Sequence, residues 1–308
     1  MYNVFIDGKE GTTGLQIFDR LGKRRDVRVI ALPEEKRKDV AARREAINGA
    51  DVVFLCLPDG AAKESVSLVE SDKVKVIDAS TAHRTAAGWA YGFPELSAEH
   101  RRAIASSRFI ANPGCYASGF IALVYPLVKR GIAAADYPFV CHAVSGYSGA
   151  GKKGIAQYEG AERDVSLETP RLYGLTLSHK HLPEMVAQCG LSRRPVFNPY
   201  ICDYYSGMSV TVPLFAGLLE KRVTPADVRA LFSEHYAGAK FVKVGEEPSG
   251  YIAANPFDGT NQMEILVNGN DEQILLTARF DNLGKGASGA AVQNMNIALG
   301  LDESTGLL

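Results

Sequence analysis

Residues 2–14 read YNVFIDGKEGTTG, a short apolar strand that runs directly into a loop with three evenly spaced glycines. Gly8, Gly11 and Gly14 precede a helical run that begins near Leu15. A glycine-rich turn between a strand and a helix gathers backbone N–H groups, and parallel α/β proteins bind the pyrophosphate of a dinucleotide at such a turn. The spacing is not G-x-G-x-x-G, so the loop by itself also fits a tight turn that binds nothing.

Strands and helices alternate through the first third of the chain. Further short apolar strands are predicted at residues 27–32, 51–57, 74–78 and 109–111. Such alternation predicts a doubly wound parallel sheet with helices on both faces, which is a Rossmann-like fold.

The pattern changes after about residue 130. Longer strands, several with period-two alternation, are predicted at residues 139–144, 210–214, 241–244, 263–268 and 273–280. They indicate a mixed or antiparallel sheet in a second, α+β domain. The Ala-rich segment 286–301 is predicted to be a helix that returns to the first domain. We therefore expect a discontinuous domain of residues 1–114 and 285–308, and a second domain of residues 115–284.

The composition limits both the architecture and the partners. The 308 residues suit two domains, and the net charge of −1 gives no field that would attract nucleic acid or an anionic membrane. The sequence shows neither an apolar run long enough to span a membrane nor a signal peptide. Five cysteines form neither a C-x-x-C pair nor a metal-ligand spacing, so we expect a cytoplasmic protein without a bound metal.

One cysteine stands where a helix is expected to begin. It is Cys115, in the stretch Asn112-Pro113-Gly114-Cys115-Tyr116, which the apolar run 117–124 follows. Asn112 is predicted to be the N-cap and Pro113 the first helical residue. The positive end of a helix dipole favours the thiolate, the nucleophilic form of cysteine. The alternative is that Cys115 is a small core residue.

Residues 146–153 nearly match the phosphate-binding loop of nucleotide hydrolases. The two glycines and the lysine have the right spacing, but Lys153 stands where that loop needs a serine or threonine for Mg²⁺. We therefore expect a site for a small anion such as phosphate, with a plain surface loop as the alternative. The candidate residues are Ser145, Ser148, Gly149 and Lys152.

Two histidines form the second chemical cluster. His179 and His181 are two residues apart, so they share one face of an extended segment, and Pro183 and Glu184 open the next helix. Either histidine could exchange a proton with a cysteine thiolate. No third and fourth ligand accompanies them, which disfavours a metal site. A histidine that only forms structural hydrogen bonds is the alternative for each.

The residues after the second predicted strand bear on the choice of cofactor. Glu34 and Glu35 lie where an acidic side chain would bind the ribose 2′-hydroxyl of NAD. Lys36, Arg37 and Lys38 follow at once and could bind the 2′-phosphate of NADP. We favour NADP, with a solvated charged surface as the alternative.

With these residues in view, the chain resembles the shorter class of the N-acetyl-gamma-glutamyl-phosphate reductases. Aspartate-semialdehyde dehydrogenases are wider relatives, and glyceraldehyde-phosphate dehydrogenases share the two-domain plan. The resemblance covers nearly the whole chain. The segments that carry it are residues 5–16, 78–84, 91–96, 112–116, 145–152, 179–184 and 281–286.

The resemblance implies a fold, a reaction and an assembly. The second domain would have the fold of the glyceraldehyde-phosphate dehydrogenase C-terminal domain, and the enzyme would be a homodimer or homotetramer. Cys115 would attack the acyl phosphate N-acetyl-L-glutamyl 5-phosphate and release inorganic phosphate. NADPH would then reduce the thioester to the semialdehyde, a step of arginine biosynthesis. His181 is the first choice as proton donor and acceptor, and His179 is the second.

The resemblance also assigns residues to the two ligands. Those expected at the cofactor are Gly8, Gly11, Thr12, Thr13, Gly14, Lys36, Arg37, Ser80, Asn112 and Asn282. Those expected at the substrate and its phosphate are Arg84, Ser145, Ser148, Gly149, Lys152 and Glu184.

Three alternative functions use the same residues differently. An aspartate-semialdehyde dehydrogenase would need an acid for the substrate amine, and Glu184 is the candidate. A cysteine hydrolase would use Cys115 and a histidine without a cofactor, and would have no need of the N-terminal glycine loop. A non-catalytic dinucleotide sensor would bind NADPH without turnover.

Overall fold

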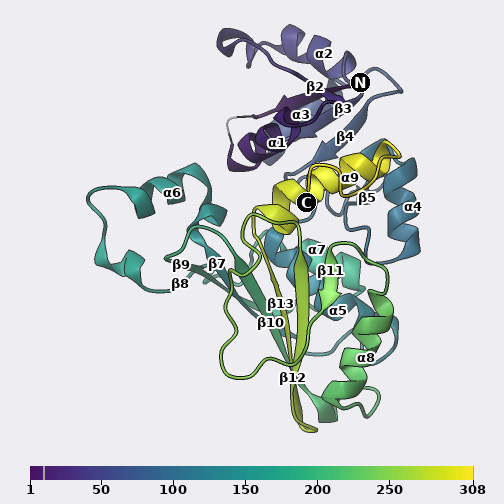
Figure 1. Cartoon of the computed structure of the whole chain (residues 1–308), viewed down its shortest axis with the longest axis vertical. Helices are drawn as coiled ribbons and strands as arrows, with labels where there is room; N and C mark the ends of the chain where they lie inside the picture. The colour runs from purple at the N-terminus through teal and green to yellow at the C-terminus, as the bar shows by residue number, and fades with distance from the viewer. Residues whose placement is uncertain (10, 308) are drawn as a thin grey trace. The chain divides into compact units, whose positions relative to one another are not determined.

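A computed structural model describes residues 1–9 and 11–307, so Glu10 and Leu308 lie outside the described residues. It divides the chain into two compact units (Figure 1). Unit 1 comprises Met1–Pro113 with Ala287–Leu308, and unit 2 comprises Gly114–Gly286.

Unit 1 is built on a parallel sheet. Within the described residues the sheet has six strands in the order β2-β1-β3-β4-β6-β5, and every neighbouring pair is parallel. Its strands are β1 (Tyr2–Asp7), β2 (Val27–Ile30), β3 (Val52–Leu55), β4 (Lys75–Asp78), β5 (Ala90–Tyr91) and β6 (Phe109–Ala111). Its helices are α1 (Thr12–Gly22), α2 (Val40–Asn48), α3 (Asp59–Ser67), α4 (Ala98–Ser106) and α9 (Gly289–Ala298). The predicted Rossmann-like sheet is confirmed, and its strand order reverses at β1.

The turn between β1 and α1 is too crowded for side chains at two of its glycines. Gly8 has a φ of +86°, and a Cβ there would lie 2.4 Å from the carbonyl oxygen of Cys56, just beyond β3. A Cβ on Gly14 would lie 2.6 Å from the carbonyl oxygen of Gly8. Gly11 is different, because a Cβ there would meet nothing closer than 3.6 Å. The turn therefore folds tightly on itself only because Gly8 and Gly14 lack side chains.

Unit 2 contains a mixed sheet. Within the described residues it has seven strands in the order β11-β12-β13-β10-β7-β9-β8. The pairs β7/β9 and β11/β12 are parallel and the others are antiparallel. The strands are β7 (Val140–Gly146), β8 (Arg171–Leu172), β9 (Val196–Cys202), β10 (Met208–Phe215), β11 (Val242–Val244), β12 (Met263–Gly269) and β13 (Gln273–Phe280). The helices are α5 (Cys115–Lys129), α6 (Gly151–Glu159), α7 (Leu182–Cys189) and α8 (Pro225–His235).

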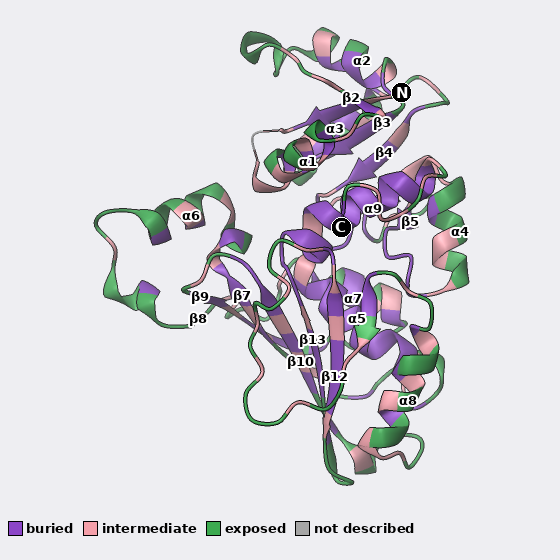
Figure 2. Ribbon diagram, in the orientation of Figure 1, coloured by how far each residue is buried: buried purple, intermediate pink, exposed green. Residues whose placement is uncertain are grey.

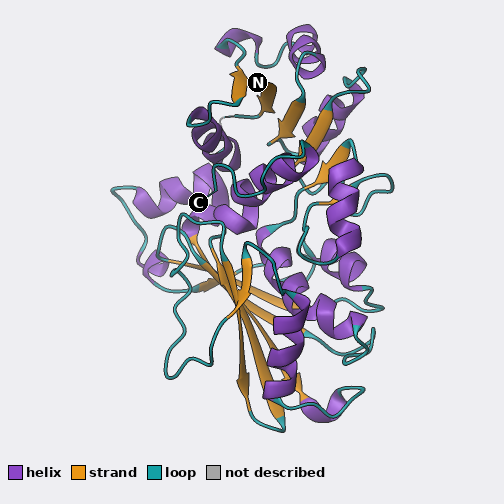
Figure 3. Ribbon diagram, turned by 45° about the vertical axis from the view of Figure 1, so that its right-hand side comes forward, coloured by secondary structure: helices purple, strands orange, loops and turns teal. Residues whose placement is uncertain are grey.

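Helix α5 forms the centre of the unit 2 core. Its residues from Tyr116 to Leu127 are all buried, as the purple ribbon in Figure 2 shows. It packs against β10 and β13, and a Cβ on Gly119 would lie 2.5 Å from Cγ2 of Val210. In Figure 3 the helices α5, α7 and α8 lie on one side of this sheet. The absence of a side chain at Gly119 thus allows the helix that begins at Cys115 to lie close to the sheet.

Some element boundaries differ from the sequence prediction. Helix α1 begins at Thr12 rather than near Leu15, because Gly11 already adopts the extended conformation of an N-cap. Helix α9 spans Gly289–Ala298, and a single π-helical turn, Gly284–Ser288, precedes it. None of the helices in the described part of the chain is both long and apolar enough to cross a membrane.

Two alanine substitutions test the geometry of the β1–α1 turn. We expect Gly14→Ala to lower the free energy of unfolding by about 1–3 kcal/mol, because its Cβ would clash with backbone atoms. Gly11→Ala is the matched control, since its Cβ has room and its φ of −69° suits alanine. Urea unfolding followed by circular dichroism measures both. Equal stability of the two variants would contradict the crowded geometry.

Candidate active site

The first candidate site is a pocket of about 310 Å³ in unit 1. It lies beside the carboxyl ends of β1 and β2, where doubly wound sheets bind nucleotides. Its lining residues are Phe5, Ile6, Asp7, Gly8, Lys9, Val29, Ile30, Ala31, Leu32, Arg37, Lys38 and Leu57. An apolar floor with cationic residues at its edge fits an adenosine that carries a phosphate.

The charged residues after β2 differ in their relation to this pocket. Arg37 and Lys38 line it, whereas Glu34, Glu35 and Lys36 are not among its lining residues. Nη2 of Arg37 also lies 3.9 Å from Oε2 of Glu34. Lys36, expected at the cofactor, is an exposed residue of a short 3₁₀ turn. Both charged residues after β2 that line the pocket are cations, which favours a 2′-phosphate.

The glycine loop gives the same pocket a further cation. Gly8 and Lys9 line it, and the Lys9 ammonium lies 3.3 Å from the centre of the Phe18 ring. Gly11 is the N-cap of α1, and Thr12 and Thr13 form its first turn. Backbone N–H groups in a first helical turn are not used by the helix itself, so they are available to an anion.

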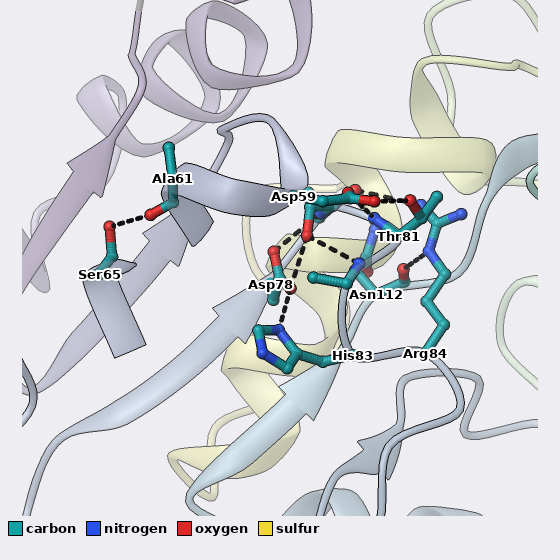
Figure 4. A network of polar contacts seen from close by, with 11 residues as sticks. Asp59, Ala61, Ser65, Asp78, Thr81, His83, Arg84 and Asn112 are labelled. Atoms are coloured by element: carbon teal, nitrogen blue, oxygen red, sulfur yellow. Dashed lines mark hydrogen bonds and ion pairs between the residues drawn. The ribbon is translucent and has the colours of Figure 1, made fainter. Parts of the chain in front are cut away.

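A buried carboxylate fixes the loop that follows β4 (Figure 4). Asp78 accepts hydrogen bonds from the backbone N–H and the hydroxyl of Ser80, each at 2.8 Å. Its other contact is Nδ1 of His83 at 2.6 Å, and the His83 ring stacks on Trp89 with centroids 4.0 Å apart. Ser80, expected at the cofactor, is thus held rigidly at the same edge of the sheet as the glycine loop.

Arg84 and Asn112 lie together in unit 1, and each contacts backbone. Nε of Arg84 donates to the carbonyl oxygen of Asn112 at 3.0 Å, and Nη2 donates to that of Ala79 at 3.1 Å (Figure 4). The side chain of Asn112 donates to the carbonyl oxygen of Ala287 and accepts from Asn294. Arg84, expected to bind the substrate phosphate, therefore holds the loop through two carbonyl groups.

The prediction that Asn112 caps the cysteine helix is wrong. Helix α5 begins at Cys115 with Gly114 as its N-cap, and Pro113 precedes it. The Asn112 side chain is hydrogen-bonded to Ala287 and Asn294, and it does not cap α5. The prediction that Cys115 occupies the first turn is confirmed.

A carboxylate from a distant part of the sequence, rather than Asn112, is hydrogen-bonded to the backbone at the start of α5. Oε2 of Glu184, in the first turn of α7, accepts a hydrogen bond from the N–H of Gly114 at 3.1 Å. Glu184 is only 1 % exposed. Glu184 was expected at the substrate, and the structure places it at the start of α5. On the other side of Cys115, a Cβ on Gly286 would lie 2.9 Å from the cysteine Cβ.

Both histidines lie around Tyr116, the residue after the cysteine. The Tyr116 ring centre lies 5.9 Å from that of His179 and 6.0 Å from that of His181. The two histidine rings are 4.7 Å apart and nearly perpendicular. His181 is 5 % exposed and directly precedes α7, and its backbone N–H donates to Nδ1 of His179 at 3.2 Å. The structure thus brings both predicted bases against the residue that directly follows the predicted nucleophile.

The expected anion loop is held by an asparagine. Nδ2 of Asn282 donates to the Ser148 hydroxyl at 3.0 Å, and Oδ1 accepts from the N–H of Gly207. A Cβ on Gly149 would lie 3.2 Å from Oγ of Ser145 and 3.3 Å from Nδ2 of Asn282. Three of the four expected residues, Ser145, Ser148 and Gly149, therefore converge, and Asn282, expected at the cofactor, supports them.

Lys152, the fourth expected residue, is exposed and lies in the first turn of α6. Among the described residues, no group of three or more histidine, cysteine or acidic side chains is arranged to hold a metal ion.

Two tyrosines of the site escaped the sequence analysis. The ring centres of Tyr116 and Tyr173 lie 6.3 Å apart, and the Tyr116 hydroxyl donates to the carbonyl oxygen of Tyr200 at 3.3 Å. Burial raises the pKa of Tyr116 and of Tyr173 well above the ordinary value, so both stay protonated. The position of Tyr116 next to Cys115 was a usable signal, whereas Tyr173 lies in a loop without any motif.

Comparison with known protein families divides the chain as the fold does. Residues 22–104 match the family described as "Semialdehyde dehydrogenase, NAD binding domain". Residues 115–282 match "Semialdehyde dehydrogenase, dimerisation domain".

Curated relatives match over nearly their whole length. The chain is 49 % identical to N-acetyl-gamma-glutamyl-phosphate reductase 2 of Pseudomonas putida, covering 98 % of both chains. It is 48 % identical to N-acetyl-gamma-glutamyl-phosphate reductase of Mesorhizobium japonicum, covering 97 % of this chain and 99 % of the relative.

Solved structures with a similar fold are more distant. Aspartate semialdehyde dehydrogenase II of Vibrio cholerae has a TM-score of 0.73 at 15 % identity, over 97 % of this chain and 98 % of that one. The Candida albicans aspartate semialdehyde dehydrogenase with NADP has a TM-score of 0.69 at 14 % identity, over 96 % of this chain and 98 % of that one. At these identities the likeness shows the fold alone.

The contact between Gly286 and Cys115 yields a test. We expect Gly286→Ala to displace the cysteine and to slow its alkylation by iodoacetamide at least severalfold, because the new Cβ has no room. Gly217→Ala is the matched control in the same unit, since a Cβ there meets nothing within 4 Å. Peptide mass spectrometry reports the rate at Cys115. Wild-type reactivity of Gly286→Ala, with the fold intact, would refute this packing.

Proposed function

The chain belongs to the N-acetyl-gamma-glutamyl-phosphate reductase family, and we propose that it converts N-acetyl-L-glutamyl 5-phosphate into N-acetyl-L-glutamate 5-semialdehyde for arginine biosynthesis. The relatives at 46–49 % identity carry this name. The observation that carries the proposal lies in unit 2, where Cys115 begins a buried helix and both histidines pack against Tyr116, the next residue. Such a pair of nucleophile and base performs acyl transfer.

Cys115 is the nucleophile that forms the covalent intermediate. Its thiolate attacks the acyl carbon, the C–O bond to phosphate breaks, and inorganic phosphate leaves. Position N1 of α5 supports this role, because the positive end of the helix dipole stabilises negative charge on sulfur and on the acyl oxygen. The backbone N–H of Cys115 is the donor that we propose for the oxyanion.

NADPH, when bound, supplies the hydride that reduces the thioester carbon. The residues of unit 1 fit this cofactor. The glycine loop offers the first turn of α1 to the pyrophosphate, and Arg37 and Lys38 border the pocket where a 2′-phosphate would lie. Unit 1 is therefore the proposed NADP-binding domain, and unit 2 the proposed catalytic and oligomerisation domain.

His181 is the proposed proton donor and acceptor. The reaction needs a proton at the thiohemiacetal oxygen, and its collapse to the aldehyde returns that proton. His179 is the weaker candidate, because its Nδ1 accepts the backbone N–H of His181. Protonating Nδ1 would break that bond, so His179 is better suited to fix the His181 backbone.

The leaving phosphate is assigned to the loop after β7. Ser145 and Ser148 supply hydroxyl groups, and the Gly149 backbone lies between them and Asn282. Lys152 in the first turn of α6 would neutralise the charge. The absence of a side chain at Gly149 lets the backbone approach a small anion closely.

An aspartate-semialdehyde dehydrogenase activity is less well supported. Glu184, the acid that would bind a substrate amine, is 1 % exposed and accepts the N–H of Gly114. A buried carboxylate that already serves a helix terminus is a poor partner for an additional amine.

We also propose that copies of the chain associate in the reducing cytoplasm. The match of unit 2 to a dimerisation domain supports a homodimer or homotetramer. Large apolar side chains also lie exposed on strands of the second sheet, with Phe215 at 59 % and Leu275 at 37 % exposure. The five free cysteines suit a reducing compartment.

Reverse turnover tests the proposed reaction. We expect the wild-type chain to reduce NADP when given N-acetylglutamate semialdehyde and phosphate, and to remain nearly inactive with aspartate semialdehyde. Cys115→Ser should abolish this activity and leave NADPH binding intact, because the pocket proposed for the cofactor lies in unit 1. Absorbance of the reduced cofactor measures turnover. Phosphate-independent activity, or substantial activity of Cys115→Ser, would refute the proposal.

A pair of histidine substitutions tests the acid–base assignment. His181→Asn should lower kcat about 10²–10⁴-fold and remove one limb of the pH–rate profile. His179→Asn should cost less and keep both limbs, because its amide oxygen can still accept the backbone N–H of His181. Loss of the limb only in His179→Asn would reverse the assignment.

A further inference from the structure

We propose that the buried ion pair between Asp7 and Arg43 sets the spacing between the two phosphate-binding parts of the cofactor pocket, and that this spacing underlies a preference for NADP over NAD. The inference rests on the proposed cofactor pocket of unit 1. It makes Arg43 a positioning residue, because its guanidinium contacts protein groups and acts on the cofactor through residues that precede it in the chain.

The ion pair lies at the carboxyl end of β1. Nε and Nη2 of Arg43 lie 3.2 and 3.1 Å from Oδ2 of Asp7, and both side chains are buried. The Ser65 hydroxyl accepts from Nη2 at 2.6 Å and lies 2.8 Å from the same Asp7 oxygen. The carbonyl oxygen of Ala61 is a second acceptor for that hydroxyl, at 3.0 Å (Figure 4). The Asp7 carboxylate is thus held from two sides.

The guanidinium of Arg43 joins three elements of unit 1. Its Nη1 donates to Oε1 of Glu64 at 2.8 Å, and the Glu64 side chain is half exposed. Glu64 and Ser65 belong to α3, Asp7 ends β1, and Arg43 itself lies in α2. A planar guanidinium donates in fixed directions. The position of α2 is therefore defined relative to both β1 and α3.

A buried ion pair is a poor source of stability. Removing two charges from water costs about as much as their attraction returns, and apolar residues of similar volume are often equally stabilising. The hydrogen bonds between a guanidinium and a carboxylate are directional, so they supply a fixed geometry. A role of Asp7 and Arg43 in position is therefore better supported than a role in stability.

Asp7 fixes one end of this geometry at the glycine turn. It is the last residue of β1, and it lines the pocket together with Gly8 and Lys9. The turn has constraints of its own, because a Cβ on Gly8 would lie 2.4 Å from the carbonyl oxygen of Cys56. The N–H of Cys56 also donates to the carbonyl oxygen of Asp7 at 2.8 Å. The turn is therefore the fixed side of the pocket.

Arg43 fixes the other end through the start of α2. Asp39 is the N-cap of this helix, and its carbonyl oxygen accepts the N–H of Arg43 at 3.0 Å. The Asp39 side chain also accepts a backbone N–H of the first turn at 2.7 Å. Arg37 and Lys38, which line the pocket, directly precede this cap. A shift of α2 would therefore move both pocket cations.

The two dinucleotides differ in how they use these two ends. NADP and NAD share the pyrophosphate, which the glycine turn would bind. Only NADP has the 2′-phosphate that Arg37 and Lys38 would meet. Loosening α2 should therefore weaken the binding of NADP and leave that of NAD nearly unchanged. A loss of stability alone would weaken the binding of both by the same factor.

The test compares the binding of NADPH and NADH to the full chain by isothermal titration calorimetry, without substrate. Arg43→Met should lower the affinity for NADPH about tenfold, which corresponds to one lost charge-assisted contact at the 2′-phosphate. The affinity for NADH should stay close to that of the wild type. Arg43→Lys should lower the affinity for NADPH as well, because one ammonium group cannot replace the fork of donors. Since lysine keeps the charge, this variant separates position from electrostatic attraction.

Arg44→Met is the matched control on the same helix. The Arg44 guanidinium pairs with Glu70, and both side chains are exposed. The affinities of this variant for NADPH and NADH should match those of the wild type, because exposed ion pairs contribute little. Circular dichroism at the titration temperature checks the fold of every variant.

Two results would overturn the inference. One is an Arg43→Met chain that loses affinity for NADPH and NADH by the same factor, and the other is an unchanged affinity of that variant for NADPH. If Arg43→Met does not fold, a wild-type ratio of the two affinities in Arg43→Lys has the same consequence. These results leave the proposed reaction untouched. A wild-type chain that binds neither dinucleotide would instead refute the cofactor assignment and, with it, this inference.

Discussion

The hydrogen bond between the Glu184 carboxylate and the N–H of Gly114 is the contact on which the site depends. It joins the starts of two helices, because Gly114 precedes α5 and Glu184 lies in the first turn of α7. Cys115, the proposed nucleophile, is the first residue of one helix, and His181 directly precedes the other. One buried polar contact therefore joins the starts of the two helices that carry the proposed nucleophile and its proposed proton partner.

The surroundings of this contact show why small residues recur near it. Gly119 brings α5 close to β10, and Gly286 leaves just enough room for the cysteine. Bulky neighbours restrict side chains. Tyr116 packs against both histidine rings and Phe197 packs against the ring of His179, which limits the movement of these rings. In unit 1, Gly8 and Gly14 likewise allow a tight turn, and apolar strand residues line the pocket beside it. Close approach of one backbone segment to another therefore requires glycine, whereas a fixed side-chain orientation requires rigid packing around that side chain.

Much of the fold and part of the site could be predicted from the sequence. The parallel sheet, the mixed sheet and the position of Cys115 in a first turn all follow from periodic patterns and local turn chemistry. The N-cap of α5 could not be predicted in this way. The best local candidate, Asn112, forms its side-chain hydrogen bonds with residues 287 and 294, which lie far along the chain. Tyr173 was missed for a similar reason. Its ring lies against Tyr116, a contact across 57 positions that no motif records.

A single-turnover experiment without reduced cofactor tests the central claim most directly. The enzyme would be mixed with N-acetyl-L-glutamyl 5-phosphate alone, quenched, and examined for released phosphate and for a modified Cys115 peptide. A cysteine nucleophile predicts a burst of phosphate equal to the concentration of active sites, together with an N-acetylglutamyl adduct on Cys115. Enzyme that turns over with NADPH but shows neither the burst nor the adduct, or carries the adduct elsewhere, would contradict the account.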